Sequence, residues 1–230
     1  MNIAIIPARL GSKRLRQKNI KNFFGKPIIF YSIEAAKKTK IFDKIIVSTE
    51  SEKLKRIVEK NGAEVPFLRP KKMADDKSHF NEAIAFTINQ LKEKYNNINY
   101  ICCIYPTSPL VNYKDIIKGL KILKKSESYV FSACKYISPP QRSFYFKNRK
   151  LKFLLPNNYH KRSQDLETIY HDAGQFYWGS QKTWINEKVI FNNKSKIVEI
   201  DYLNFMDINY LEDFKLAKQL YRTVFSKHEK

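Results

Sequence analysis

Short apolar runs alternate with segments of helical periodicity along most of this chain, and this alternation restricts the fold more than any other feature. We expect strands at residues 2–7, 44–48, 64–68, 100–105 and 129–135, with later strands at 174–178 and 197–200. We expect helices at residues 28–38, 52–60, 78–95, 113–125 and 210–225. Strands that alternate with crossover helices are typical of a doubly wound, mostly parallel sheet, so the predicted class is α/β with a Rossmann-like arrangement.

Helix-start signals support this assignment. Pro27 suits the first position of the first helix, because proline lacks the N–H that this position does not need. Thr49 with Glu52, and Asn209 with Glu212, have the spacing of capping boxes, and Ser78 can cap the third helix. The chain is therefore expected to alternate regularly from strand to helix.

The pattern breaks between residues 136 and 172, where Pro139-Pro140 and Asn157-Asn158 interrupt short alternating stretches at 143–146 and 151–155. Such stretches predict an inserted β-hairpin arm rather than another crossover. Because neither an internal repeat nor a second domain is evident, residues 1–230 are interpreted as one domain that carries an arm at about 136–172.

The apolar runs are far shorter than the ~20 residues that a membrane helix needs, so no membrane partner is expected. Arg9 interrupts the first apolar run, which argues against a signal peptide and for a cytoplasmic protein. The chain has three cysteines, Cys102, Cys103 and Cys134, all in strand-like runs. They are expected to be buried thiols rather than a disulfide framework or a zinc site.

The chain contains 43 Lys and Arg against 22 Asp and Glu, a net charge of +21. Clustered basic residues are a mark of nucleic-acid binding. These lysines are spread along the whole chain, so we expect no nucleic-acid partner, and a basic nucleic-acid-binding protein remains the alternative from a different functional class.

The loop that follows the first predicted strand is strongly basic, with five cations in the ten residues 9–18 and a Gly11-Ser12 turn. Ligands of open α/β sheets bind beyond the carboxyl ends of the strands, so this loop could hold a polyphosphate. A solvated loop in a lysine-rich protein is the other interpretation. A P-loop is excluded because Pro27 follows Gly25-Lys26, and G-x-G-x-x-G is absent.

Several ordered motifs give the chain a family resemblance. They are Pro7-Ala8-Arg9-Leu10-Gly11-Ser12-Lys13-Arg14, Lys18-Asn19, Leu68-Arg69-Pro70, Ala74-Asp75-Asp76, Pro106-Thr107-Ser108-Pro109-Leu110 and Asp207-Ile208. This series resembles the CMP-sialic acid synthetase family of cytidylyltransferases over nearly the whole chain. Arg162-Ser163-Gln164-Asp165-Leu166 and Tyr170-His171-Asp172-Ala173-Gly174 resemble its bacterial pseudaminic acid cytidylyltransferase branch.

The resemblance implies transfer of CMP from CTP to the anomeric hydroxyl of a nonulosonic acid, with Mg²⁺ assisting and pyrophosphate leaving. It also implies a catalytic role for Arg9, Lys18 and Asp207. The nucleotide-binding residues that it implies are Ala8, Arg9, Leu10, Gly11, Ser12, Lys13, Lys18, Asn19, Arg69 and Ser78. From the residues alone, Arg69 could equally be a surface partner for a carboxylate.

The same resemblance implies a sugar site made of Tyr105, Thr107, Ser108, Arg142, Arg162, Gln164, His171 and Asp172. Pro106 and Pro109 could also form an ordinary rigid turn, and His171 could be a structural ring rather than a general base. Sialic acid enzymes usually carry Gln and Arg where this chain has Tyr105 and Val111. The expected sugar is therefore pseudaminic acid rather than N-acetylneuraminate.

Asp207 is the expected magnesium ligand, because Mg²⁺ favours one or two carboxylates together with phosphate oxygens and waters. Relatives tend to have Asp-x-Asp at this point, whereas this chain has Asn209, which could supply a carbonyl oxygen or simply cap the last helix. In this family the arm usually reaches across a two-fold axis to complete the partner's site. The apolar arm residues Phe144, Phe146 and Phe153 agree with a homodimer.

Two enzymatic alternatives remain. The same reaction could act on N-acetylneuraminate, legionaminate or another 2-keto acid sugar. A nucleotide-sugar glycosyltransferase could share the fold, but such enzymes commonly expose Asp-x-Asp after a central strand, and this sequence contains no such motif.

Overall fold

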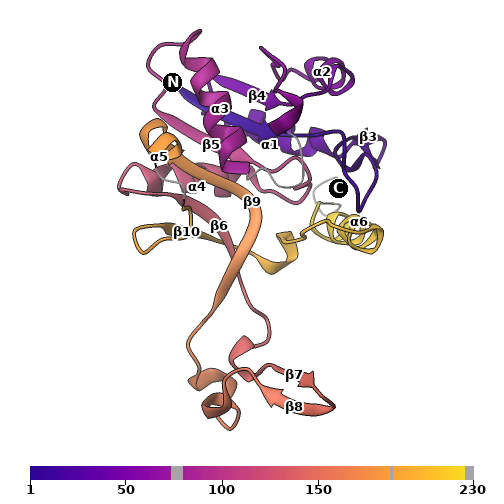
Figure 1. Cartoon of the computed structure of the whole chain (residues 1–230), viewed down its shortest axis with the longest axis vertical. Coiled ribbons are helices and arrows are strands. Elements are labelled where there is room, and N and C mark those ends of the chain that lie inside the picture. The colour runs from indigo at the N-terminus through magenta and orange to yellow at the C-terminus, as the bar shows by residue number, and fades with distance from the viewer. Residues whose placement is uncertain (74–79, 187–188, 226–230) are drawn as a thin grey trace.

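A six-stranded sheet forms the centre of the computed structural model, which describes residues 1–73, 80–186 and 189–225. The strand order is β10-β6-β9-β5-β1-β4, and β9 runs antiparallel to both of its neighbours while the other pairs are parallel. The strands are β1 (Asn2–Pro7), β4 (Lys44–Ser48), β5 (Tyr100–Ile104), β6 (Val130–Lys135), β9 (Tyr170–Ser180) and β10 (Lys196–Ile200). The predicted α/β class is confirmed (Figure 1).

Helices cover both faces of this sheet. The α-helices are α1 (Ile29–Thr39), α2 (Glu52–Glu59), α3 (Phe80–Lys92), α4 (Tyr113–Leu123), α5 (Gln181–Asn186) and α6 (Leu211–Phe225). Apolar side chains of α1, α2 and α4 pack in one core cluster, together with Ala4 and Ile6 of β1. Ile84, Ile88 and Leu91 of α3 pack in a second cluster with Ile3 and Ile5, the other side chains of β1. Since successive strand residues point to opposite faces, β1 is buried on both sides, as expected for a central parallel strand.

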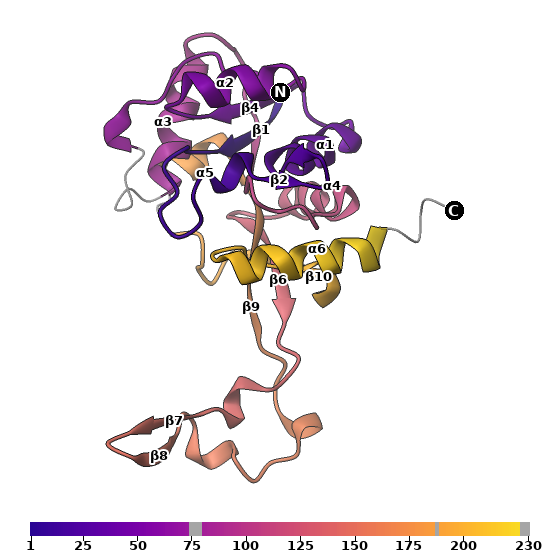
Figure 2. The same cartoon turned by 90° about the vertical axis from the view of Figure 1, so that its right-hand side faces the viewer.

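The closing helix α6 packs on a third cluster, outside the main sheet (Figure 2). Phe214 and Ala217 of α6 contact Phe23 and Ile28 of the segment that follows the first loop. This segment contains the short antiparallel strands β2 (Asn22–Phe23) and β3 (Lys26–Pro27). The arrangement brings the start of α6 beside the loop that follows β1, because Leu15 of this loop and Ile208 belong to the same cluster.

Two details of the predicted helices and strands are wrong. Residues 64–68 form a single bridge, Ile46 with Glu64, rather than a strand. Pro66 explains this difference, because it has no N–H with which to continue the ladder. Pro27 lies in β3, not in α1.

The two capping boxes also differ from the prediction. Ser51, not Thr49, caps α2 by accepting the Leu54 N–H at 3.3 Å. At the start of α6 an Asp213 oxygen accepts the N–H groups of Asn209 and Tyr210, both at 2.8 Å, in place of Glu212. Each helix still begins within a residue or two of its predicted start.

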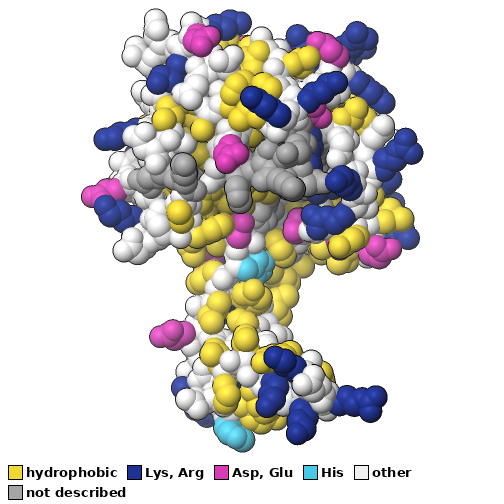
Figure 3. All heavy atoms as spheres, viewed as in Figure 1, with side chains coloured by type: hydrophobic (Ala, Val, Ile, Leu, Met, Phe, Trp, Pro, Cys, Tyr) yellow, Lys and Arg dark blue, Asp and Glu magenta, His cyan; other side chains and the backbone are white. Residues whose placement is uncertain are grey.

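The arm projects from the sheet between β6 and β9 (Figures 1 and 2). Its hairpin pairs β7 (Phe144–Lys147) with β8 (Lys150–Phe153), as the alternating pattern predicted. Apolar side chains gather around the neck that joins the sheet to the hairpin (Figure 3). Phe144 and Phe146 are 55% and 69% exposed, so the described chain does not cover them.

Short 3₁₀ helices complete the secondary structure. They are η1 (Lys18–Ile20), η2 (Lys71–Met73), η3 (Pro140–Arg142), η4 (Pro156–Asn158), η5 (Ser163–Asp165) and η6 (Tyr202–Asn204). None of the helices in the described part of the chain combines the length and apolar character that crossing a bilayer requires.

Candidate active site

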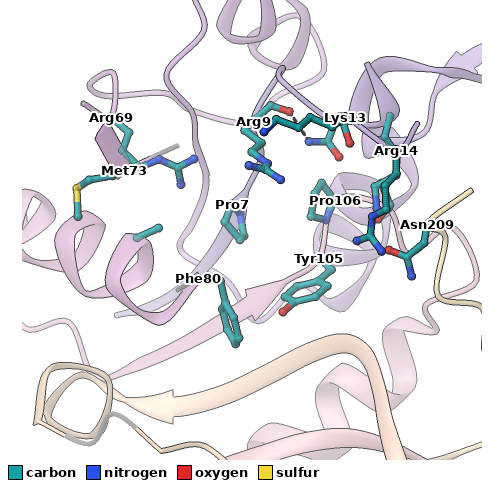
Figure 4. A pocket seen from close by; sticks show the side chains of 15 residues that line it. Pro7, Arg9, Lys13, Arg14, Arg69, Met73, Phe80, Tyr105, Pro106 and Asn209 are labelled. Carbon is teal, nitrogen blue, oxygen red and sulfur yellow. Dashed lines mark hydrogen bonds between the residues drawn. The ribbon is translucent and has the colours of Figure 1, made fainter. Parts of the chain in front are cut away.

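A cavity of about 570 Å³ opens beyond the carboxyl ends of β1 and β5 (Figure 4). Its cationic lining residues are Arg9, Lys13, Arg14, Lys18 and Arg69. Its other lining residues are Pro7, Ser12, Asn19, Met73, Phe80, Ala83, Tyr105, Pro106, Thr107 and Asn209. The lining described for this cavity therefore contains five cations and no carboxylate, a charge balance that suits a polyanion.

The loop after β1 is held to the sheet by backbone and side-chain hydrogen bonds. The Ala8 N–H donates to the Ser48 carbonyl at 2.9 Å, which continues the β1–β4 ladder into the loop. Asn19 is buried, and its Nδ2 donates to the Arg9 carbonyl at 2.7 Å, so the far end of the loop folds back onto its start. These contacts hold the cations at one edge of the sheet.

Lys18 connects this loop to the segment before α6. Its Nζ donates to the Ile208 carbonyl at 2.5 Å. Burial lowers the pKa of Lys18, nearby Asp207 opposes this shift, and the positive charges of Arg14 and Arg9 add to it. A bound anion would stabilise the charged form of Lys18 in the same way as Asp207 does.

Arg69 lies on the opposite wall of the cavity from Arg14 (Figure 4). Only 4% of its side chain is exposed, and its backbone N–H donates to the Thr49 carbonyl at 2.8 Å. A Glu50 oxygen lies 3.7 Å from its Nη2. Arg69 thus pairs with a carboxylate, but it is buried rather than at the surface, and it lines the cavity.

Aromatic residues form the floor below these cations. Tyr105 contacts Phe80 and Tyr177, with ring centroids 5.5 Å and 5.3 Å apart. Thr107 lines the cavity, whereas the Ser108 hydroxyl turns away and donates to the Gly174 carbonyl at 3.4 Å. The residues after β5 therefore contribute one hydroxyl and one aromatic ring to the wall.

Tyr177, a residue that no sequence motif singled out, links this floor to Asp172. The Tyr177 hydroxyl donates to Asp172 Oδ2 at 2.5 Å, and the Tyr177 ring contacts the ring of Tyr105. Burial raises the pKa of both tyrosines. Asp172 is an exposed residue, yet its carboxyl group packs against protein, and this desolvation raises its pKa despite the hydrogen bonds from Tyr177 and the Gly174 N–H.

Gly174 allows this contact. Its φ of +58° is rare for residues with a side chain, and it lets the backbone of β9 turn its N–H toward Asp172 Oδ1, 2.9 Å away. Asp172 does not itself line the cavity, but Tyr177 connects it to Tyr105, which does.

Other predicted residues lie away from the cavity wall. His171 sits between Tyr136 and Phe205, with centroid distances of 4.8 Å and 4.6 Å, which agrees with a structural ring. Arg142, Arg162 and Gln164 lie on the arm, where Arg162 bonds Asp165 at 2.8 Å and Arg142 donates to Ser163 at 3.4 Å. The cavity of the same chain does not include them.

The remaining predicted residues divide into three groups. Ala8, Leu10 and Gly11 build the first loop without lining the cavity. Asn209 lines it, and its Nδ2 donates to exposed Asp207 at 2.6 Å. Ser78 lies outside the described residues.

Sequence comparison identifies relatives across the whole chain. A family model described as Cytidylyltransferase matches residues 3–230. A pseudaminic acid cytidylyltransferase from Campylobacter jejuni is 38% identical over 224 residues, which cover 96% of each chain. An N-acylneuraminate cytidylyltransferase from Escherichia coli is 32% identical over 217 residues, which cover 94% of this chain and 51% of that protein.

Solved structures share the fold. A CMP:2-keto-3-deoxy-manno-octonic acid synthetase complexed with CTP superposes with a TM-score of 0.72 at 13% identity, over 96% of this chain and 98% of the other. A 4-diphosphocytidyl-2C-methyl-D-erythritol synthase from Anaerococcus prevotii gives a TM-score of 0.64 at 15% identity, with the same coverage. At these identities the likeness concerns the fold alone.

Proposed function

Because the chain belongs to the cytidylyltransferase family, we propose that it transfers CMP from CTP to the anomeric hydroxyl of pseudaminic acid and releases pyrophosphate. The observation that carries this proposal is the cavity with five cations beyond the end of β1. A triphosphate brings about four negative charges, and phosphoryl transfer depends mainly on neutralising and aligning such charges. We also propose that the enzyme works in the cytoplasm, where CTP is made.

In this proposal the first loop holds the triphosphate. Arg9, Lys13 and Lys18 supply positive charge, and Ser12 adds a hydroxyl. Asn19 and Arg69, which also line the cavity, would contact the nucleoside. The sugar hydroxyl attacks the α-phosphorus and loses its proton, while the bond from this phosphorus to the β-phosphate oxygen breaks and pyrophosphate carries away the electron pair.

The chemistry of the donors fits a magnesium ion bound by substrate and protein together. No cluster of three or more His, Cys, Asp or Glu side chains in the described residues could hold a metal by itself. Asp207 is exposed beside the cavity, and Mg²⁺ commonly takes one or two carboxylates with phosphate oxygens and waters. Asp207 would therefore hold the ion, which would supply further charge neutralisation; Asn209 donates to Asp207 and need not be a ligand.

The sugar end of the proposed site begins at Tyr105 and Thr107 and includes Asp172 through Tyr177. The relative from Campylobacter jejuni is named for pseudaminic acid, which supports this sugar over N-acetylneuraminate, legionaminate and other 2-keto acid sugars. An acidic sugar needs a cation for its carboxylate, and Arg142 and Arg162 are candidates on the arm.

Those arginines can serve a site only if the arm reaches a second copy of the chain. The exposed rings of Phe144 and Phe146 offer the apolar surface that such a contact would cover. We therefore propose a homodimer in which each arm completes the sugar site of the partner.

The test is pyrophosphate release from CTP and Mg²⁺, with pseudaminic acid, legionaminic acid, N-acetylneuraminate and 3-deoxy-manno-octulosonate offered separately. Turnover restricted to pseudaminic acid is expected. Turnover with another of these sugars would keep the reaction and correct the substrate. No turnover with any of the four, from folded protein, would contradict the proposed function.

A further inference from the structure

Glu50 is a carboxylate beside a basic cavity, and neither the motifs nor the proposed reaction assigns it a role. It follows β4, whose carboxyl end lies next to that of β1 in the sheet. The cations of the cavity wall would attract a polyanion, and an unpaired carboxylate beside them would repel it and weaken its binding. Its contacts explain how the site can accommodate it.

The two oxygens of Glu50 face two different walls of the site. Oε1 accepts the backbone N–H of Leu10, in the first loop, at 2.9 Å. Oε2 lies 3.7 Å from Nη2 of Arg69. The side chains of Arg69 and Glu50 are only 4% and 14% exposed, so solvent screens this ion pair little.

Arg69 needs such a partner to keep its place. Burial and the positive charge of Arg9 both disfavour the charged guanidinium, and they lower the pKa of Arg69, whereas Glu50 raises it. Figure 4 shows the guanidinium groups of Arg9 and Arg69 directed toward the same space. Without Glu50, repulsion between these groups would favour movement of Arg69 away from the cavity.

The Arg69–Glu50 contact is an ion pair without a hydrogen bond. Within the described residues, Arg69 Nε and Glu50 Oε2 are buried and make no hydrogen bond. Arg69 is thus held in position by charge while donor capacity remains for a ligand.

We propose that Glu50 is a positioning residue for nucleotide binding, which ties Arg69 to the backbone of Leu10 and holds the guanidinium against the cavity. This role rests on the proposed binding of CTP in this cavity. Glu50 acts through Arg69 and touches no reacting atom.

A double-mutant cycle with Glu50→Gln and Arg69→Gln tests this role. Glutamine in place of Glu50 keeps the volume and can still accept the Leu10 N–H, so the substitution removes mainly the charge that faces Arg69. We expect Glu50→Gln to weaken CTP binding about tenfold in calorimetry, the size of a charge-assisted contact. The KM for the sugar should stay unchanged, and the double variant should bind CTP no more weakly than Arg69→Gln alone.

Two further variants control the experiment. Glu127→Gln removes a carboxylate whose ion pair with Lys194 is exposed, and it should leave CTP binding unchanged. Glu50→Asp keeps the charge on a shorter side chain, so its CTP affinity should lie between those of the wild type and Glu50→Gln. If Glu50→Gln does not fold, Glu50→Asp takes its place in the cycle, where it should weaken CTP binding by less than tenfold because its shorter side chain cannot reach both partners.

The outcomes separate this role from the proposed function. The positioning role would be overturned if Glu50→Gln bound CTP as tightly as the wild type. It would also be overturned if Glu50→Gln weakened CTP binding equally in the wild-type and Arg69→Gln backgrounds. Either result would leave the nucleotide site in place. A wild-type protein that binds no CTP would remove the proposed function and this role together.

Discussion

The cavity and the arm differ in how their side chains are paired or covered. In the cavity, charged groups that would prefer water are held at the protein surface or buried with partners, as in Arg69 with Glu50 and Lys18 with the Ile208 carbonyl. In the arm, Phe144 and Phe146 would prefer burial, yet more than half of each residue is exposed. The cavity is organised within one chain for a polyanion, whereas the arm has a surface that only another molecule can cover.

This difference suggests a division of labour in the proposed site. The nucleotide half comes from the first loop and the strand ends of one chain. The cations assigned to the sugar carboxylate lie on the arm, and the lining of the cavity of the same chain does not include them. Substitutions in the cavity should therefore impair CTP binding and catalysis, whereas substitutions in the arm should impair assembly and use of the sugar.

Lys18→Ala should have the largest effect, because Lys18 is a half-buried cation that connects the first loop with the Ile208 carbonyl. We expect kcat/KM to fall about 100-fold or more, the usual cost of removing one preorganised charge-stabilising group. Lys121→Ala, on the exposed side of α4, is the matched control and should behave as wild type. Normal activity of Lys18→Ala would separate the first loop from catalysis.

Replacing Phe144 and Phe146 together by serine should affect assembly. Both rings are exposed in one chain, so the fold should survive, but the dimer should lose apolar contacts and dissociate. Light scattering should show a monomer whose turnover falls by at least about tenfold while CTP affinity changes little. Leu216→Ser, also at an exposed apolar position, is the control. A wild-type protein that is already monomeric at micromolar concentration would contradict the dimer.

Tyr177→Phe should have a moderate effect at the sugar end. The substitution removes the hydroxyl that donates to Asp172 and leaves the ring contact with Tyr105 in place. Loss of one hydrogen bond to a charged group predicts a rise of about tenfold in the KM for the sugar. The affinity for CTP, measured by calorimetry, should not change; an effect confined to CTP would place Tyr177 in the nucleotide half.

The smallest effect should come from pH. The pKa of Lys18 is lowered from its ordinary 10.5, so its charge is lost at a lower pH than in other lysines. Since the ammonium form binds phosphate, CTP affinity should weaken as the pH rises toward that lowered pKa, and the loss should begin at a lower pH than an ordinary lysine would give. Lys18→Arg, which stays charged, should remove this alkaline loss. An unchanged pH profile in Lys18→Arg would assign the loss to another group.

The alternation of apolar runs was enough to predict the sheet, because buried parallel strands and crossover helices have distinct periodicities. The strand predicted at 64–68 was wrong for a local reason. Its apolar pattern is that of a strand, but Pro66 has no N–H to donate to the ladder. The predicted capping residues were also wrong for a local reason. Ser51 and Asp213 lie within two residues of Thr49 and Glu212 and make the capping hydrogen bonds instead. Apolar periodicity therefore predicts which helices and strands form better than it predicts the residues that cap them.

The candidate site was predictable where strands end and less so elsewhere. The basic loop after β1 was found because its charge density is visible in the sequence. Glu50 could have been found by the same rule, as it follows the strand beside β1. Tyr177 had no such signal: it lies within an apolar strand, and its role depends on Asp172, which a β-bulge and Gly174 bring beside it.

Subunit complementation tests the central claim that one chain supplies the nucleotide half and that the arm of another chain completes its sugar half. Lys18→Ala and Arg142→Ala/Arg162→Ala should each be nearly inactive alone. Unfolded together in equal amounts and refolded, they should regain about one quarter of wild-type pyrophosphate release, because half of the dimers then contain one intact site of two. A mixture no more active than its components would contradict the shared site.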